Sequence, residues 1–242
     1  MAGELLLERY GGPAHGVESK SSATDLVSDA DRVSEAAVKD LLATERPEDG
    51  LLAEEGSAHE SASGRRWVID PLDGTINYLY RLPTWCVSVA LEDEQGGVVA
   101  VVHDPLRAET FTAERGRGAR LNGHEIHVSG EERPERALIA TGFGYSPDVR
   151  AAQAEVVSRV LPRFRDIRRA GAAALDLADL AAGRLDGYYE RGLKPWDLAA
   201  GALLCACAGL DVRPLPETGG LPSGLLVAPA PLTDSLQALV AS

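Results

Sequence analysis

The sequence predicts an α+β fold in which helices and sheets are stacked in layers. Helical and extended patterns are mixed along the chain without a strict β-α alternation, which argues against a doubly wound parallel sheet. Hydrophobic residues make up 45% of the 242 residues, which is enough for a sizeable core. No apolar run is long enough to span a membrane, and no basic segment precedes the short N-terminal apolar run, so we expect no secretion signal.

The first part of the chain mixes both kinds of pattern. A helix is predicted over residues 28–44, because Val33, Val38 and Leu41 recur at helical spacing. A buried strand is predicted at residues 67–70. The other expected elements are short helices at 1–10 and 74–80, an extended segment at 16–22, and strands at 51–56, 85–93, 97–105, 109–114 and on both sides of a turn at Asn122-Gly123.

Residues 129–136 predict a domain boundary, because they are polar and turn-forming and show no periodicity. We therefore expect an N-terminal α+β domain, residues 1–133, and a C-terminal α/β domain, residues 134–242. The expected elements of the second domain are strands at 137–143, 165–171, 185–190, 210–215 and 224–229, and helices at 146–161, 172–183, 195–209 and 232–242.

The charge balance limits the partners of the protein. With 37 acidic and 24 basic residues, the formal net charge is −13, which disfavours nucleic acid and anionic membranes as partners. The same charge would repel a phosphorylated metabolite unless a cation intervenes. Cys86, Cys205 and Cys207 are odd in number and lie in apolar stretches, which indicates reduced thiols and a cytoplasmic protein.

Asp70 and Asp73 form an acidic doublet at the end of an apolar run. We expect the strand to end at Pro71, which has no N–H, and Asp73 to project from the turn. Gly74 and Thr75 then open a helix whose first N–H groups can bind an anion. Taken singly, Asp73 would cap that helix and Asp70 would be a solvated strand end. Together, the two adjacent anions favour a bound cation, and their hard oxygen atoms suit Mg²⁺.

Other acidic residues also end apolar segments. Glu54 and Glu55 end a predicted strand, Asp197 lies in the first turn of an apolar helix, and Asp31 lies at a helix start. The alternative for each is ordinary helix capping or a solvated end. A metal-dependent phosphoryl-transfer site needs convergent carboxylates, a helix N-terminus for the phosphate, and a hydroxyl with a base for the water. The sequence contains all of these parts.

Four segments of the chain resemble the inositol monophosphatase family. WVIDPLDGTINYLY is similar to its D-P-x-D-G-[ST]-x-N signature, and KPWDLAAG to its W-D-x-A-A-G signature. LLAEEG resembles its Glu-Glu element, and KSSATDLVSDAD its N-terminal K-x-x-x-x-D-x-V-[ST]-x-x-D segment. The matches cover nearly the whole chain in the right order. They imply the α-β-α-β-α sandwich of the sugar phosphatases and a Mg²⁺-dependent, lithium-sensitive phosphatase that is usually a homodimer.

The resemblance also implies roles for the acidic residues. Glu54, Asp70 and the Leu72 carbonyl would hold one Mg²⁺, Asp70, Asp73 and Asp197 a second, and Glu54 would help to place a weaker third ion. The catalytic residues would be Glu54, Asp31 and Thr75, with Thr75 hydrogen-bonded to Asp31 so that it orients and deprotonates the attacking water. The N–H groups of Gly74 and Thr75 would hold the phosphate.

Further residues would contact the alcohol part of the substrate. The resemblance implies that Glu190 and the turn Gly171, Ala172 and Ala173 contact sugar or inositol hydroxyls, and that Lys20 lies near the metals. Lys194 replaces a residue that is often His in animal enzymes, which adds a cation near the substrate. Ala172 replaces Ser or Thr, so one hydroxyl contact is missing. The family usually begins with a full helix before the K-S-S segment, and only residues 1–10 correspond to it here, so we expect the sequence to start inside that helix.

Three functions are therefore considered. The first is hydrolysis of myo-inositol monophosphate or a similar small sugar phosphate by metal-activated water. The second is a sibling phosphatase with the same metal core, acting on fructose 1,6-bisphosphate, histidinol phosphate or 3′-phosphoadenosine 5′-phosphate. The third is a regulatory protein that binds the transcription machinery.

Overall fold

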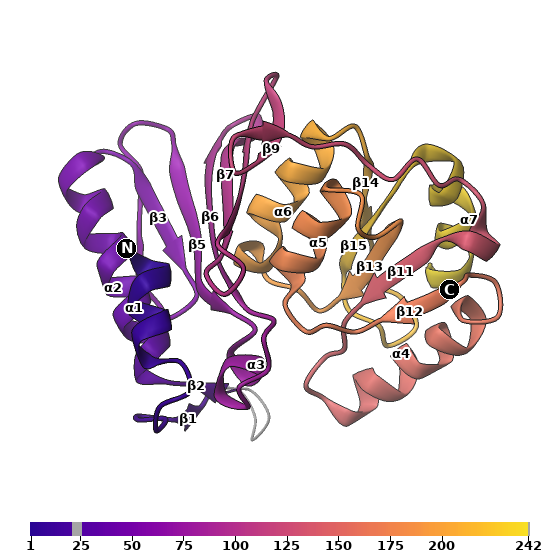
Figure 1. The fold of residues 1–242 in the computed structure, drawn as a ribbon, viewed down its shortest axis with the longest axis horizontal. Helices are drawn as coiled ribbons and strands as arrows, with labels where there is room; N and C mark the ends of the chain where they lie inside the picture. Colours follow the sequence, from indigo (N-terminus) through magenta and orange to yellow (C-terminus); the bar gives the residue numbers. More distant parts are fainter. Residues whose placement is uncertain (21–25, 242) are drawn as a thin grey trace.

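The computed structural model describes residues 1–20 and 26–241, and five stacked layers of helix and sheet make up this part of the chain (Figure 1). The layered α+β architecture predicted from the sequence is confirmed. The helical layers, in order, contain α1 (Ala2–Arg9) with α2 (Asp29–Glu45), α5 (Ala173–Ala181) with α6 (Pro195–Cys207), and α4 (Pro147–Val160) with α7 (Ala230–Val240). The two sheets lie between these helical layers.

The larger sheet has eight strands in the order β10-β9-β8-β7-β6-β5-β3-β4. Its strands are β3 (Gly50–Ala53), β4 (Ala58–His59), β5 (Arg66–Asp73), β6 (Cys86–Asp93), β7 (Gly96–Asp104), β8 (Glu109–Glu114), β9 (Gly118–Leu121) and β10 (His124–Glu125). Only β3 and β5 run parallel within this sheet, and the hairpin turn predicted at Asn122-Gly123 is present. Strand β4 is an addition to the strands expected from the sequence.

The smaller sheet has five strands in the order β12-β11-β13-β15-β14. Its strands are β11 (Leu138–Thr141), β12 (Asp166–Arg168), β13 (Gly187–Arg191), β14 (Asp211–Leu215) and β15 (Gly224–Ala228). Strand β11 runs parallel to both β12 and β13, whereas β15 runs antiparallel to its two neighbours. The remaining elements are β1 (Glu18–Ser19) paired with β2 (Leu26–Val27), the short helix α3 (Thr75–Leu79), and a 3₁₀ turn at Pro134–Arg136.

The hydrophobic core lies in three parts between the layers. One part fills the space between α1, α2 and the outer face of the larger sheet, and another lies under α4 and α7. The central part joins residues of the larger sheet, such as Phe111 and Val102, to residues of α5 and α6, such as Leu177 and Leu204. Because residues from both halves of the chain build this central part, independent folding of the domains 1–133 and 134–242 stays a prediction.

The end of β5 differs from the sequence-based expectation. The strand does not end at Pro71 but continues to Asp73, with a shift of register in between. Asp70 pairs with Ser88 of β6, and Asp73 pairs with Cys86. A β-bulge accommodates the missing N–H of Pro71, because the bulged residues leave the regular ladder. The bulge therefore brings both aspartates to the end of one continuous strand.

Among residues 1–20 and 26–241, no helix is both long enough and apolar enough to cross a bilayer.

Candidate active site

A cavity of about 550 Å³ opens between the end of β5, helix α3, the start of α5, strand β13 and the start of α6. Most of the residues singled out by the sequence line it. These are Glu54, Asp70, Leu72, Asp73, Gly74, Thr75, Gly171, Ala173, Glu190 and Asp197. Asp31, Ala172, Lys20 and Lys194, all within the described residues, lie outside the lining. Part of the N-terminal signature, residues 21–25, lies outside the described residues.

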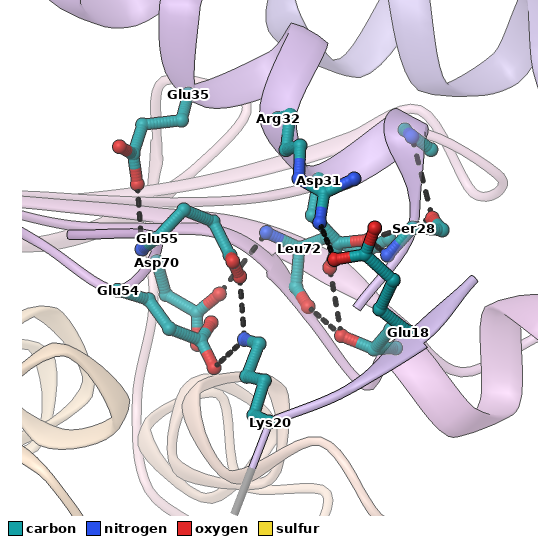
Figure 2. Close-up of polar contacts among 12 residues, drawn as sticks. Glu18, Lys20, Ser28, Asp31, Arg32, Glu35, Glu54, Glu55, Asp70 and Leu72 are labelled. Carbon is teal, nitrogen blue, oxygen red and sulfur yellow. Dashed lines mark hydrogen bonds and ion pairs between the residues drawn. The ribbon is translucent and has the colours of Figure 1, made fainter. Parts of the chain in front are cut away.

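Asp70 is a buried residue of the cavity lining. Its side chain is only 2% exposed, and its Oδ1 accepts a hydrogen bond of 3.0 Å from the N–H of Leu72 (Figure 2). Burial raises the pKa of Asp70 well above its ordinary value, and the neighbouring charges of Glu54, Asp73 and Asp197 add to this effect. Asp70 is therefore a carboxylate that needs a cation, or a proton, in order to stay in place.

Asp73 joins the two halves of the site. Its Oδ2 and Oδ1 accept hydrogen bonds from the N–H groups of Ala174 (2.7 Å) and Ala173 (3.2 Å). Asp73 therefore caps α5, which lies a hundred residues away, and not α3, which follows it in the sequence. The buried thiol of Cys86 also points to Oδ2, at 3.7 Å. Burial raises the pKa of Asp73 to about 7, although the α5 N–H groups act in the opposite direction.

Asp197 is the third residue of α6 and lines the same cavity. Its Oδ2 accepts a hydrogen bond of 2.6 Å from the N–H of Lys194, so the capping role considered from the sequence is present. Burial raises the pKa of Asp197 to about 7, and the charges of Asp73 and Glu54 act in the same direction. Capping and a place in the carboxylate cluster are therefore combined in one residue.

Glu54 follows β3 and is already held by a cation. Lys20 Nζ donates hydrogen bonds to Glu54 Oε1 at 2.8 Å and to Glu55 Oε1 (Figure 2). Burial opposes the charge on Lys20, but the two carboxylates outweigh it and raise the pKa of the amine. Burial also raises the pKa of Glu55 to about 7, with Lys20 acting against this shift. Glu35 of α2 anchors the turn, because its Oε2 accepts the N–H of Glu55 at 2.8 Å.

Next to this cluster, Thr75 and Asp31 form a hydroxyl–carboxylate pair. Thr75 Oγ1 lies 2.9 Å from Asp31 Oδ1 and 3.0 Å from the carbonyl oxygen of Leu72, so its single proton can serve either acceptor. Asp31 is fully buried, and its Oδ2 accepts hydrogen bonds from the N–H (2.8 Å) and the hydroxyl (2.7 Å) of Ser28 (Figure 2). The hydrogen bond expected between Thr75 and Asp31 is therefore present.

The turn between Asp73 and α3 requires a glycine. Gly74 has φ 89°, in the left-handed region, and a Cβ added to it would lie 2.8 Å from the carbonyl oxygen of Thr84. Asn77 of α3 secures the same turn, because its Nδ2 donates to the carbonyl oxygens of Thr84 (2.7 Å) and Ala170 (2.9 Å). The loop before α5 is thus tied to α3 across the site.

Three further residues at the site were not identified from the sequence. Asp176 of α5 is only 4% exposed, and burial raises its pKa to about 8, with Glu190 and Asp73 adding to the shift and Arg169 acting against it. Arg169 lines the cavity, and its guanidinium packs against Gly171 so closely that a Cβ there would overlap it. Tyr188 is fully buried, and its hydroxyl donates a hydrogen bond to Glu190. A carboxylate in the apolar run AAALDLADLAA was a usable signal for Asp176, whereas Tyr188 reads as an ordinary core residue.

The donor atoms of the cluster suit a hard divalent cation. Glu54, Asp70, Asp73 and Asp197 supply carboxylate oxygens to one cavity. Burial, together with the charges of neighbouring carboxylates, raises the pKa values of Asp70, Asp73 and Asp197. Within the described residues, no three acidic, histidine or cysteine side chains could hold a metal ion as they are now arranged. The residues therefore fit the ion by type and charge, and in the present arrangement Lys20 donates a hydrogen bond to Glu54.

Comparisons with known proteins agree with this site. The profile described as "Inositol monophosphatase family" matches residues 1–241. Inositol-1-monophosphatase SuhB of Mycobacterium tuberculosis (strain ATCC 25618 / H37Rv) is 41% identical over 234 residues, which cover 93% of this chain and 80% of that protein. Nus factor SuhB of Escherichia coli (strain K12) is 41% identical over 210 residues, 86% of this chain and 79% of that protein.

Solved structures share the fold. Extragenic suppressor protein suhB from Bartonella henselae matches with a TM-score of 0.91 and 36% identity, covering 98% of this chain and 93% of that one. An IMPase/NADP phosphatase complexed with Mg²⁺ and phosphate matches with a TM-score of 0.82 and 25% identity, covering 99% of this chain and 88% of that one. The fold and the enzyme class predicted from the sequence are confirmed: this protein is a phosphatase, and the chain belongs to the inositol monophosphatase family.

Proposed function

We propose that the protein is a Mg²⁺-dependent phosphomonoesterase that hydrolyses myo-inositol monophosphate or a similar small sugar phosphate. The observation that carries this proposal is the convergence of Glu54, Asp70, Asp73 and Asp197 on one cavity, next to the hydroxyl of Thr75. Support for the substrate comes from the inositol-1-monophosphatase among the relatives, and support for Mg²⁺ comes from the neighbour crystallised with Mg²⁺ and phosphate.

The carboxylates would hold two ions. Glu54, Asp70 and the carbonyl of Leu72 would bind one Mg²⁺, and Asp70, Asp73 and Asp197 would bind the second, with Glu54 also helping to place a weaker third. Bound Mg²⁺ lowers the pKa of water toward neutrality and offsets the charge of the phosphoryl oxygens. The bound ions would also give a protein of net charge −13 local positive charge for an anionic substrate.

Thr75 and Asp31 would move the proton of the attacking water. Thr75 Oγ1 would orient the water and accept its proton while it passes its own proton to Asp31 Oδ1, 2.9 Å away. The two hydrogen bonds from Ser28 keep Asp31 in place for this step. The phosphate would be held by the N–H groups of Gly74 and Thr75, which begin α3 and have no partner within the helix.

The alcohol part of the substrate would lie toward β13 and α5. Glu190 and the turn formed by Gly171, Ala172 and Ala173 would contact its hydroxyls, as in the family. Because Ala172 has no hydroxyl, the contacts made by this turn would come from its backbone groups only. Lys20 would remain next to Glu54, and Lys194 would contribute positive charge from outside the cavity lining.

We further propose a cytoplasmic homodimer in which residues 1–133 supply most metal ligands and residues 134–242 complete the site. The free and buried thiols of Cys86 and Cys205 are in keeping with a reducing compartment. Light scattering coupled to size-exclusion chromatography tests the dimer directly, and a monomeric mass would contradict it.

The decisive experiment is a phosphate-release assay on a panel of esters, with Mg²⁺ or with EDTA. We expect myo-inositol 1-phosphate to be hydrolysed only with Mg²⁺, and Li⁺ to inhibit the reaction. Faster turnover of fructose 1,6-bisphosphate, histidinol phosphate or 3′-phosphoadenosine 5′-phosphate would assign the protein to a sibling activity. Equal activity with EDTA would refute the role given to the carboxylates.

A second candidate function follows from one relative. The Escherichia coli relative is named a Nus factor, which favours a regulatory contact with the transcription machinery in addition to catalysis. Complementation of a strain that lacks its own homologue separates the two roles. We expect Asp73→Asn to fail where the phosphatase is needed, whereas full complementation by this variant would favour the regulatory role.

A further inference from the structure

The carboxylate of Glu190 accepts a hydrogen bond from a buried tyrosine. The hydroxyl of Tyr188 donates a hydrogen bond of 2.9 Å to Glu190 Oε2. Tyr188 is fully buried in the central core, so its ring has no room to follow a moving carboxylate. Residues two apart on a strand face the same side, which places Tyr188 and Glu190 together on the side of β13 toward α5.

The carboxylate of Glu190 occupies space that is open because residue 142 is a glycine. Gly142 follows β11 and is buried, and a Cβ built on it would overlap Cδ and both oxygens of Glu190. Its φ is outside the left-handed region, so the requirement for glycine at this position is steric and not conformational. Any side chain at position 142 would push the carboxylate out of its place.

We infer that Tyr188 and Gly142 position Glu190 so that Oε1 accepts a hydrogen bond from a hydroxyl of the substrate. Tyr188 occupies Oε2, whereas Oε1 has no hydrogen-bond donor among residues 1–20 and 26–241, and Glu190 lines the cavity. This inference rests on the proposed function, because it assumes that the ester carries a polyol. Tyr188 is then a positioning residue that acts through Glu190 and selects polyol esters over esters without hydroxyls.

The neighbouring tyrosine offers a matched control. Tyr189 is also buried, but it points to the opposite face of β13, into the core under α4 and α7. Its hydroxyl lies beside the side chain of Thr141 and makes no contact with Glu190. Tyr188→Phe and Tyr189→Phe therefore delete the same atom from adjacent buried residues, and only the first deletion removes a contact to Glu190.

The test compares KM, kcat and the inhibition constant of inorganic phosphate, which has no alcohol part. We expect Tyr188→Phe to raise the KM for myo-inositol 1-phosphate about 5-fold, in the range of one hydrogen bond to a charged group. The kcat and the phosphate inhibition constant should stay within about 2-fold, because the metal and phosphate contacts remain. Tyr189→Phe should leave all three values unchanged. A purely structural tyrosine would alter the phosphate inhibition constant and KM together.

Two further variants show whether the effect passes through Glu190. Gly142→Ala should raise KM in the same manner. Adding Tyr188→Phe to Glu190→Ala should cause no further rise, because interacting residues are non-additive. Unchanged KM in Tyr188→Phe, or a full further rise in the double variant, would overturn the inference.

A structural readout keeps the inference separate from the proposed function. If the wild type prefers another sugar phosphate, the proposed substrate is wrong, and the same comparison applies to that ester. Crystal structures of the wild type and Tyr188→Phe do not depend on activity. We expect the Glu190 carboxylate to leave its position beside Gly142 in the variant, and an unmoved carboxylate would overturn the inference whatever the substrate.

Discussion

At the scale of single residues, the site is dominated by negative charges that lie close together away from water. Asp73 shows how the protein tolerates this arrangement. Two N–H groups of α5 stabilise its ionised form, yet burial still raises its pKa to about 7. The residue therefore links the C-terminal half of the chain to the carboxylate cluster and keeps charge available for a cation.

Replacing Asp73 by asparagine tests the importance of that charge. We expect Asp73→Asn to lower kcat/KM at least about 100-fold, because a metal ligand loses its charge. The amide oxygen can still accept an N–H of α5, so Tm should change little. Phosphate release with excess Mg²⁺ and a thermal melt measure the two effects. Asp29→Asn is the control, since Asp29 is an exposed acid paired with Arg32, and activity retained in Asp73→Asn would refute the ligand role.

A second prediction concerns the hydroxyl of Thr75. Thr75→Val removes Oγ1 while it preserves the shape of the side chain, so the proton path to Asp31 is lost. We expect kcat to fall about 100-fold, the scale of general base catalysis, while KM changes less. Thr75→Ser retains the hydroxyl and should keep most of the activity. Similar kcat values for the valine and serine variants in steady-state assays would show that the hydroxyl does not take part.

At the scale of elements, the packing of α5 against α6 positions the two halves of the cluster. Asp73 caps α5, and Asp197 lies in the first turn of α6. Gly201 allows the helices to approach, because a Cβ at this position would lie 2.6 Å from Cβ of Leu177. The glycine of the W-D-x-A-A-G pattern is thus explained by helix packing and not by contact with a substrate.

Substituting Gly201 tests this packing. Gly201→Ala should destabilise the protein by about 1–2 kcal/mol, because overpacking outweighs the better helix propensity of alanine. Urea unfolding measures the change in the free energy of unfolding. Combining it with Leu177→Ala should cost less than the sum of the two single changes, because the clash is relieved. Additive effects would show that the two residues do not compete for space.

Most elements could be predicted from the sequence because their patterns are local. The helix at Asp29–Glu45 follows from the spacing of its apolar residues, and the hairpins follow from their turn residues. The end of β5 could not be predicted, because Pro71 prevents a regular ladder and only the pairing with β6 shows that a bulge restores it. Local chemistry shows where a strand is disturbed, whereas the neighbouring strand determines whether it continues.

At the scale of the whole molecule, the carboxylates couple stability to pH. Burial raises the pKa values of Asp73, Asp197 and Glu55 to about 7 in the metal-free protein, above their ordinary values near 4. Between these values the folded protein binds more protons than the unfolded chain. The contribution of these groups to stability is therefore present at low pH and is lost as the pH rises through about 7.

Mg²⁺ should replace those protons. We expect Mg²⁺ to raise Tm more at about pH 8, where the carboxylates are ionised and repel one another, than at about pH 6, where protons compete with the ion. Thermal melts with EDTA or Mg²⁺ at the two pH values measure the difference. Asp73→Asn should reduce the gain at the higher pH. An equal gain at both pH values would contradict the coupling between the carboxylates and the ion.

The sequence alone determined the layered α+β class and the candidate carboxylates, because periodicity and short motifs are local properties, whereas the Thr75–Asp31 pair was implied by the resemblance to the inositol monophosphatase family. Only the tertiary structure decided that Asp73 caps α5 and that Lys20 holds Glu54. It also decided that Tyr188 holds Glu190, since a buried tyrosine within an apolar strand gives no sign of its partner. Burial and proximity set these roles, and both depend on residues brought together by the fold from distant parts of the chain.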